Sequence, residues 1–429
     1  MRFSKVTKNA LWIIGCRIVQ SVLALAINIL QVRAFGPSDF GLISYAASVV
    51  AFFAPLMKLG IDCVLVNELV RYPEKEGETM GSALLLTLIS SVLCVGGVIG
   101  FAFVANPGET ETVWICALYS TLLVAQSLEM TQYWFQAKYL SKYMSMTVLV
   151  AFLVVSAYRL FLLMTGKSVY WFAVSQAFDY TMIAIALLIF YKVKGGSPMR
   201  VSRDAIKRLL GQSKHYILPQ LLVTGYAQID KIMLKGMGDE ETVGYYAAAV
   251  SVCHFTNFVF GAINDSMRPS IIEQKQKDQE EYQRQLTHLY RIMIYLAVLQ
   301  AIVVTVFAEL ILKILYEEQF LASAGALRIV IWGTMLSYIG SVRSIWMLAE
   351  SKQKYLLAIN ICGIVVNILL NMLLISRFGM IGAAITSLIT QFITNVGVGL
   401  VLKPLRENNR YVLRSLDPRP LLRYLRRKR

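Results

Sequence analysis

The chain has 429 residues, of which 57% are hydrophobic and only 16% are charged, and its formal net charge is +16. Together with a mean hydropathy of +0.58, this composition excludes an ordinary soluble globular protein. The basic excess does not indicate nucleic-acid binding, because the apolar segments leave no compact soluble domain to carry a DNA-reading surface.

Apolar stretches of about 20 residues, each long enough to cross a bilayer as a helix, recur along the whole chain. They predict an all-α polytopic membrane protein with about twelve transmembrane helices. The expected spans are 9–32, 40–66, 82–105, 112–135, 143–164, 169–191, 214–236, 243–266, 289–308, 323–348, 354–375 and 380–402. Most Lys and Arg residues fall on alternate loops beginning with the N-terminus, so the positive-inside rule predicts that both termini are cytoplasmic.

Polar residues form a stripe along the first two predicted helices. On the first helix Arg17, Gln20 and Asn28 share a face, and a polar stripe in a membrane must face other helices or water. On the second, Lys58 and Asp62 stand four residues apart, a spacing at which they can pair within one helix.

The fifth and sixth predicted helices add two intramembrane charges, Arg159 and Asp179. A charge within a membrane span is costly, so such residues are candidates for a functional site.

A basic segment containing Gly-Gly-Ser-Pro separates six spans from the six that follow. The turn after the first helix, near Gly36 and Gly41, also resembles the turn after the seventh, near Gly238 and Gly244. Six spans per half keep both halves in the same orientation, which predicts a parallel repeat about an axis along the membrane normal. The expected parts are an N-terminal lobe (1–192), a cytoplasmic linker (193–213), a C-terminal lobe (214–402) and a basic cytoplasmic tail (403–429).

The stretch 219–249 is the most informative one, because adjacent Asp230 and Lys231 lie deep in an apolar helix. Gln220 and Thr224 share a face with Lys231. These residues favour a site, and the alternative is an ion pair that locks two helices together.

The eighth and eleventh predicted helices contribute Asn257 and Asn367 to further polar stripes. The stripes favour one hydrated cavity between the lobes, where transporters built from repeats bind their substrates. The alternative is a set of interhelical hydrogen bonds that hold the bundle together.

Other chemistry is not indicated by the sequence. The cysteines are single, the three histidines lack metal-ligand spacing, and no Walker A motif or nucleophile–base arrangement occurs. We therefore expect no metal, no cofactor and no enzymatic activity.

Two segments carry a resemblance to a known family: LGIDCVLVNELVR (59–71) and, above all, GYAQIDKIMLKGMGDEETVGYYAAA (225–249). With the twelve predicted helices, the chain resembles the Wzx-type polysaccharide flippases of the multidrug/oligosaccharidyl-lipid/polysaccharide exporter superfamily. The resemblance implies two six-helix lobes that alternate between inward and outward openings. It also implies that the protein flips an undecaprenyl-pyrophosphate-linked oligosaccharide across the bacterial cytoplasmic membrane, coupled to a proton or sodium gradient.

This substrate would use the intramembrane residues in three ways. Cations are expected to bind the pyrophosphate, amides and hydroxyls the sugars, and carboxylates the coupling ion. The cations are Arg17, Lys58, Arg159 and Lys231; the sugar-binding groups are Gln20, Asn28, Gln220, Thr224, Asn257 and Asn367; the carboxylates are Asp62, Asp179 and Asp230.

Two alternative functions stay open at this point. A drug or organic-cation antiporter of the same superfamily would need an acidic and aromatic cavity with few cations. An integral membrane glycan-assembly enzyme would need catalytic carboxylates in a sizeable loop. The basic tail predicts contact with anionic membrane lipids, and other glycan-assembly membrane proteins are further candidate partners. The product stays open: O-antigen of lipopolysaccharide, capsule, exopolysaccharide or teichoic acid.

Overall fold

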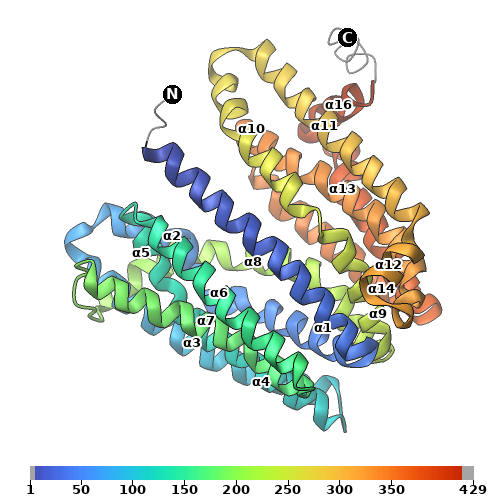
Figure 1. Ribbon diagram of the computed structural model, residues 1–429. Coiled ribbons are helices and arrows are strands. Elements are labelled where there is room, and N and C mark those ends of the chain that lie inside the picture. The colour runs from blue at the N-terminus through green and yellow to red at the C-terminus, as the bar shows by residue number, and fades with distance from the viewer. Residues whose placement is uncertain (1–4, 418–429) are drawn as a thin grey trace. The chain divides into compact units, whose positions relative to one another are not determined.

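The computed structural model describes residues 5–417, with side chains from residue 19 onward. Every regular element within this range is a helix, which confirms the all-α fold (Figure 1). The helices up to the middle of the chain are α1 (Lys5–Lys58), α2 (Ile61–Arg71), α3 (Glu76–Ala105), α4 (Thr110–Leu128), α5 (Gln132–Ala137), α6 (Ser141–Met164), α7 (Val169–Val193) and α8 (Arg203–Met237).

The second half of the chain continues the helical pattern. Its helices are α9 (Glu240–His254), α10 (Asn257–Lys277), α11 (Gln279–Val306), α12 (Ala308–Tyr316), α13 (Ala324–Ala349), α14 (Lys354–Phe392), α15 (Val398–Val401) and α16 (Arg406–Ser415). Short 3-10 turns occupy Pro73–Lys75, Glu129–Thr131, Glu318–Ser323 and Lys403–Leu405, and a π-helical turn occupies Ile393–Gly397.

The helices account for the expected membrane spans. Among the described residues, eight helical segments are long and apolar enough to cross a membrane, and α9 with α10 forms a ninth that is bent by 40°. Two of the eight, Val19–Arg71 and Lys354–Val401, have 53 and 48 residues and are broken at Gly36 and Gly379, so each holds two spans. Helix α8 is long enough to span but more polar. The protein is therefore a multi-pass membrane protein, consistent with about twelve helices.

Contacts divide the chain into two compact units, Met1–Gly244 and Tyr245–Arg429, called here the N-terminal and C-terminal units. The division falls inside α9. The expected lobes, in contrast, were separated by the segment 193–213. In the structure α8 begins at Arg203 and runs without a break to Met237, so the second half of that segment is the first part of a long helix.

The N-terminal unit is built around α1, which packs against α3, α4, α6 and α8. Helix α4 packs against both α3 and α7, and α7 against α6, so these helices lie side by side (Figure 1). One apolar core of this unit includes Leu65, Met80, Trp134, Phe135 and Leu187. Large side chains of this kind fill the space between helices and fix their spacing.

The C-terminal unit has its own core between α11, α13 and the C-terminal helices. Tyr282, Leu289, Met293 and Trp346 are fully buried there. Helix α16 packs against α11. The Tyr290 hydroxyl donates a hydrogen bond of 2.5 Å to the side-chain oxygen of Asn408, which fixes the position of α16.

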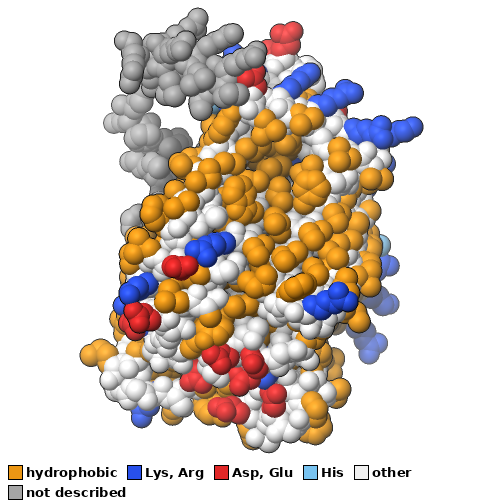
Figure 2. Space-filling model, turned by 90° about the vertical axis from the view of Figure 1, so that its right-hand side faces the viewer, with side chains coloured by type: hydrophobic (Ala, Val, Ile, Leu, Met, Phe, Trp, Pro, Cys, Tyr) orange, Lys and Arg blue, Asp and Glu red, His pale blue; other side chains and the backbone are white. Residues whose placement is uncertain are grey.

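Large hydrophobic side chains also cover much of the outer surface (Figure 2). On α3, Leu93 and Val104 are 72% and 79% exposed, and α11 exposes Leu299 and Val306 in the same way. Apolar surface of this extent is unfavourable in water but matches the hydrocarbon of a bilayer. The exposed apolar surface, like the long apolar helices, thus indicates that the protein lies in a bilayer.

Candidate functional site

A group of charged and polar side chains lies inside the N-terminal unit, between its helices. We call it the intramembrane cluster, and its members are Lys58, Asp62, Gln126, Glu129, Arg159, Asp179 and Gln220. Electrostatic interactions connect these residues: Glu129 interacts with Lys58 and Asp179, and Asp179 interacts with Arg159. The structure thus brings together predicted cations, predicted ion-binding carboxylates and one predicted sugar-binding amide.

At one edge of the cluster, Asp62 of α2 contacts Gln220 of α8. The Gln220 amide nitrogen lies 3.3 and 3.4 Å from the two carboxylate oxygens of Asp62 and 3.0 Å from the sulfur of Cys63. This contact joins two residues that the sequence assigned to different roles and that are distant along the chain.

The expected pairing of Lys58 with Asp62 is wrong in this structure. The helix breaks between them, where Leu59 and Gly60 have φ angles of 53° and 67°, so the spacing of four residues no longer places both on one helical face. No ion pair joins the two among the described residues. A Cβ atom on Gly60 would lie 2.5 Å from the carbonyl oxygen of Ser213, so glycine is required for α8 to approach the break.

Deeper in the cluster, Arg159 of α6 is only 7% exposed. Its Nε donates a hydrogen bond of 3.0 Å to Ser175 of α7, while its Nη2 atom is buried and has no hydrogen-bond partner. One carboxylate oxygen of Asp179 and the amide oxygen of Gln126 are also buried without a partner. The cluster therefore contains unused donors as well as unused acceptors.

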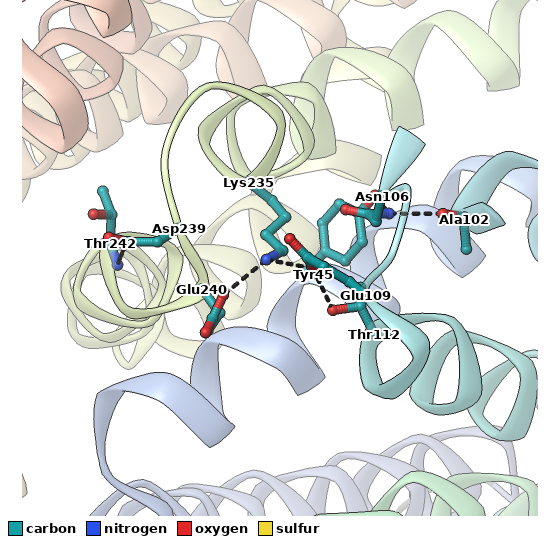
Figure 3. Close-up of polar contacts among 9 residues, drawn as sticks. All are labelled: Tyr45, Ala102, Asn106, Glu109, Thr112, Lys235, Asp239, Glu240 and Thr242. Carbon is teal, nitrogen blue, oxygen red and sulfur yellow. Dashed lines mark hydrogen bonds and ion pairs between the residues drawn. The ribbon is translucent and has the colours of Figure 1, made fainter. Parts of the chain in front are cut away.

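A second charged group lies at the C-terminal end of α8, and it was not predicted from the sequence. Lys235 is 5% exposed, and its ammonium lies 2.7 Å from a carboxylate oxygen of Glu109 and 2.7 Å from one of Glu240 (Figure 3). Glu109 also accepts a hydrogen bond of 2.7 Å from Thr112. These bonds hold the pKa of Glu109, in the α3–α4 turn, below the usual range of a glutamate.

We call Lys235, Glu109 and Glu240 the lysine clamp. Lys235 is not among the site residues predicted from the sequence. The one available signal was the acidic turn that follows it, 238–241, while Glu109 comes from a remote loop. Beside the clamp, Asn106 donates a hydrogen bond of 2.9 Å to the Tyr45 hydroxyl (Figure 3).

Backbone packing near the clamp is unusually close. A Cβ atom on Gly41 would lie 1.7 Å from the carbonyl oxygen of Glu240, and one on Gly244 would lie 1.9 Å from that of Pro37. The two segments whose sequences echo each other, one in α1 and one at the start of α9, are thus in direct contact.

The remaining predicted site residues of the N-terminal unit lie on α1 and α8. The side chain of Arg17 lies outside the described residues. Gln20 and Asn28 are half-buried on α1, as are Thr224 and Lys231 on α8, whereas Asp230 is buried.

The C-terminal unit holds two predicted sugar-binding residues. Asn257 is exposed, and its side-chain oxygen accepts a hydrogen bond of 2.7 Å from the Tyr338 hydroxyl. Asn367 is 1% exposed, and its oxygen accepts a hydrogen bond of 3.0 Å from Asn371. The two asparagines therefore lie in different surroundings, one at the surface and one in the interior of this unit.

The family of the chain follows from comparison with known proteins. The polysaccharide biosynthesis protein family matches residues 6–269, more than half of the chain. The chain belongs to this family. The MatE family also matches part of this member, residues 216–373. A curated relative, the uncharacterized membrane protein MJ1068 of Methanocaldococcus jannaschii, is 26% identical over 244 residues. That match covers 52% of the chain and only about half, 47%, of the relative.

Solved transporters share the fold of this family member. An inward-facing multidrug resistance MATE family transporter of the MOP superfamily is 15% identical with a TM-score of 0.68, over 90% of this chain and 96% of that one. The lipid II flippase MurJ in an inward closed conformation is 16% identical with a TM-score of 0.69, over 94% and 90%. A MOP superfamily transporter from Pyrococcus furiosus is 14% identical with a TM-score of 0.62, over 92% and 95%. These likenesses establish the fold as that of MOP superfamily transporters.

Proposed function

We propose that this protein is a flippase for an undecaprenyl-pyrophosphate-linked oligosaccharide. It moves this lipid from the cytoplasmic to the outer leaflet of the bacterial cytoplasmic membrane by alternating access, with both of its own termini in the cytoplasm. The observation that carries the proposal is the intramembrane cluster, in which two cations lie among hydrogen-bonding groups. Membership of the polysaccharide biosynthesis protein family and the fold shared with a lipid II flippase support it.

The chemistry of the substrate matches this cluster together with two predicted site residues that are not members of it, Arg17 and Asp230. The pyrophosphate is anionic and needs cations such as Lys58 and Arg17, while the hydrocarbon tail stays in the bilayer. Sugar hydroxyls need partners that donate and accept hydrogen bonds, as Gln220 does. Coupling to a proton or sodium gradient needs a carboxylate in the membrane, for which Asp62, Asp179 and Asp230 are the candidates.

Flipping in proteoliposomes tests the proposal directly. The substrate is lipid-linked oligosaccharide extracted from the source cells, and flipping is measured with and without an imposed proton or sodium gradient. We expect gradient-dependent flipping by the wild type and a loss of at least about tenfold in Lys58→Gln, because a charge-assisted contact is removed. Lys142→Gln, which removes an exposed charge at the start of α6, is the matched control. Wild-type rates in Lys58→Gln and Arg17→Gln would refute the pyrophosphate assignment.

A second candidate, an organic-cation antiporter, is favoured by one specific feature of the same cluster. Asp62, Glu129 and Asp179 outnumber the two cations, and the tyrosines Tyr133 and Tyr180 interact with these carboxylates. Acidic and aromatic groups together suit a cationic ligand. Export of a fluorescent organic cation from the same proteoliposomes, without any flipping of the lipid, would replace the flippase with this function.

A further inference from the structure

Four buried polar atoms have no hydrogen-bond partner, three of them in the intramembrane cluster and one on Ser156, which lies beside it on α6. They are Nη2 of Arg159, Oγ of Ser156, one carboxylate oxygen of Asp179 and the amide oxygen of Gln126. Arg159 and Ser156 are more than nine-tenths buried, at 7% and 6% exposure. Buried polar groups of native proteins are almost always satisfied, so four unsatisfied atoms in one region indicate that something else bonds to them.

The four atoms belong to three adjacent helices. Helix α7, which carries Asp179, packs against both α4 with Gln126 and α6 with Arg159. Tyr180 of α7 interacts with Gln126 as well as with Arg159, and Arg159 interacts with Asp179. No ion pair joins Arg159 to Asp179 among the described side chains, so each keeps a free bonding position.

The charges around these atoms restrict what binds there. A metal cation is disfavoured by the guanidinium of Arg159, and an anion such as phosphate is disfavoured by Asp179 and Glu129. The unsatisfied atoms are a donor, Nη2 of Arg159, two acceptors, and one hydroxyl that can act either way. A neutral group that both donates and accepts hydrogen bonds satisfies all of them, and an alcohol hydroxyl is such a group.

We propose that Arg159, Asp179, Gln126 and Ser156 form a glycan subsite that binds hydroxyl groups of the sugar. This inference rests on the proposed flippase function and adds to it a residue set for the carbohydrate part of the substrate. It assigns Arg159 to sugar and not to pyrophosphate, and it leaves Asp62 and Asp230 as the candidates for ion coupling. Ordered water, which also donates and accepts, is the competing occupant.

Binding measurements with two lipids test the subsite. One is the lipid-linked oligosaccharide extracted from the source cells, and the other is undecaprenyl pyrophosphate without a glycan. In Gln126→Met and Asp179→Asn we expect affinity for the glycan-bearing lipid to fall by about tenfold, the loss of one or two buried hydrogen bonds. Affinity for the glycan-free lipid should stay unchanged.

Matched controls lie on the same helices. Thr181→Val on α7 and Thr121→Val on α4 remove hydroxyls that already bond to the backbone oxygens of Ala177 and Leu118. Neither should change the affinity for either lipid. The thermal unfolding of each variant verifies that it folds, and Gln126→Met is the milder of the two test changes because it keeps the charge and the volume.

Three results would overturn the inference. The first is an equal loss of affinity for both lipids. The second is unchanged affinity for both lipids with unchanged flipping. The third is unchanged affinity for both lipids in Asp179→Asn while flipping no longer depends on the ion gradient. The second result would indicate that water alone occupies the site. A different result would refute the proposed flippase function: the wild type would flip neither lipid. The comparison of affinities would still show whether the protein binds the sugar.

Discussion

The buried ammonium of Lys235 and the carboxylate of Glu109 lie 2.7 Å apart, although one residue is near the end of α8 and the other is in the turn before α4. Together with Glu240 they fasten the C-terminal end of α8 to the turn between α3 and α4. The clamp is consistent with the division of the chain after Gly244, because it holds α8 with the helices that precede it.

Neutralising the clamp lysine should destabilise the protein. We expect Lys235→Met to lower the free energy of unfolding by about 1–3 kcal/mol, because two carboxylates lose a shared charge-assisted partner. Lys313→Met is the matched control: its partner Glu318 is also five residues away, but both side chains are exposed, at 59% and 73%. That change should cost less than about 1 kcal/mol. Thermal unfolding in detergent measures both, and equal effects would contradict a special role for Lys235.

The clamp should also weaken at low pH. The pKa of Glu109 in the folded protein lies below the ordinary value of 4.5, chiefly because Lys235 donates a hydrogen bond to it. A carboxylate whose pKa is lowered by folding stabilises the protein fully at any pH above its ordinary pKa. This stabilisation is lost as the pH falls through the pKa of the carboxylate in the folded protein. The difference in melting temperature between wild type and Glu109→Gln should therefore be constant near neutral pH and shrink below about pH 4.5. A difference that grows on acidification would contradict the sign of this shift.

The close contact of the two echoing segments should tolerate no added methyl group. Gly41→Ala and Gly244→Ala would each place a Cβ atom within 2 Å of a carbonyl oxygen, at 1.7 and 1.9 Å. We expect each to lower the free energy of unfolding by about 1–3 kcal/mol or more, since backbone must move. Gly100→Ala on α3 meets no atom within 4 Å and serves as the control. Its melting temperature should equal or exceed that of the wild type.

Helix α16 should bind anionic lipid. Its buried side includes Asn408 and Val412, and its opposite side exposes Arg406, Arg410 and Arg414. Such a row near a membrane surface attracts anionic lipid by about 1 kcal/mol per charge. Adding phosphatidylglycerol to phosphatidylcholine vesicles should therefore raise the melting temperature of the wild type.

The variant with all three arginines of α16 changed to glutamine should lose most of this lipid effect. Lys167→Gln with Arg377→Gln, two exposed cations on predicted outer loops, should keep it. An unchanged lipid effect in the triple variant would show that the anionic lipid binds elsewhere.

The sequence predicted the fold well because hydropathy is a local property. Runs of apolar residues define membrane helices without knowledge of their neighbours, and the all-α fold is confirmed. The charged residues inside the spans were equally visible, because a charge in an apolar run is conspicuous by itself. Their roles in binding stay predictions.

Pairing between residues could not be predicted in the same way. Lys58 and Asp62 have the spacing of a helical pair, but the left-handed backbone at Leu59 and Gly60 separates them, and Asp62 contacts Gln220 instead. At this turn α8 packs against Gly60, a contact between distant parts of the chain.

The membrane-spanning helical class, the approximate spans and the candidate charges therefore follow from the order of residues along the chain. Which polar groups meet depends on how the helices pack: Lys235 meets Glu109 and Glu240, Asp62 meets Gln220, and Arg159 lies beside Asp179. The physical reason is that the hydrophobic effect acts on each segment separately, whereas ion pairs and hydrogen bonds depend on distances of a few ångströms, which the packing of remote helices sets.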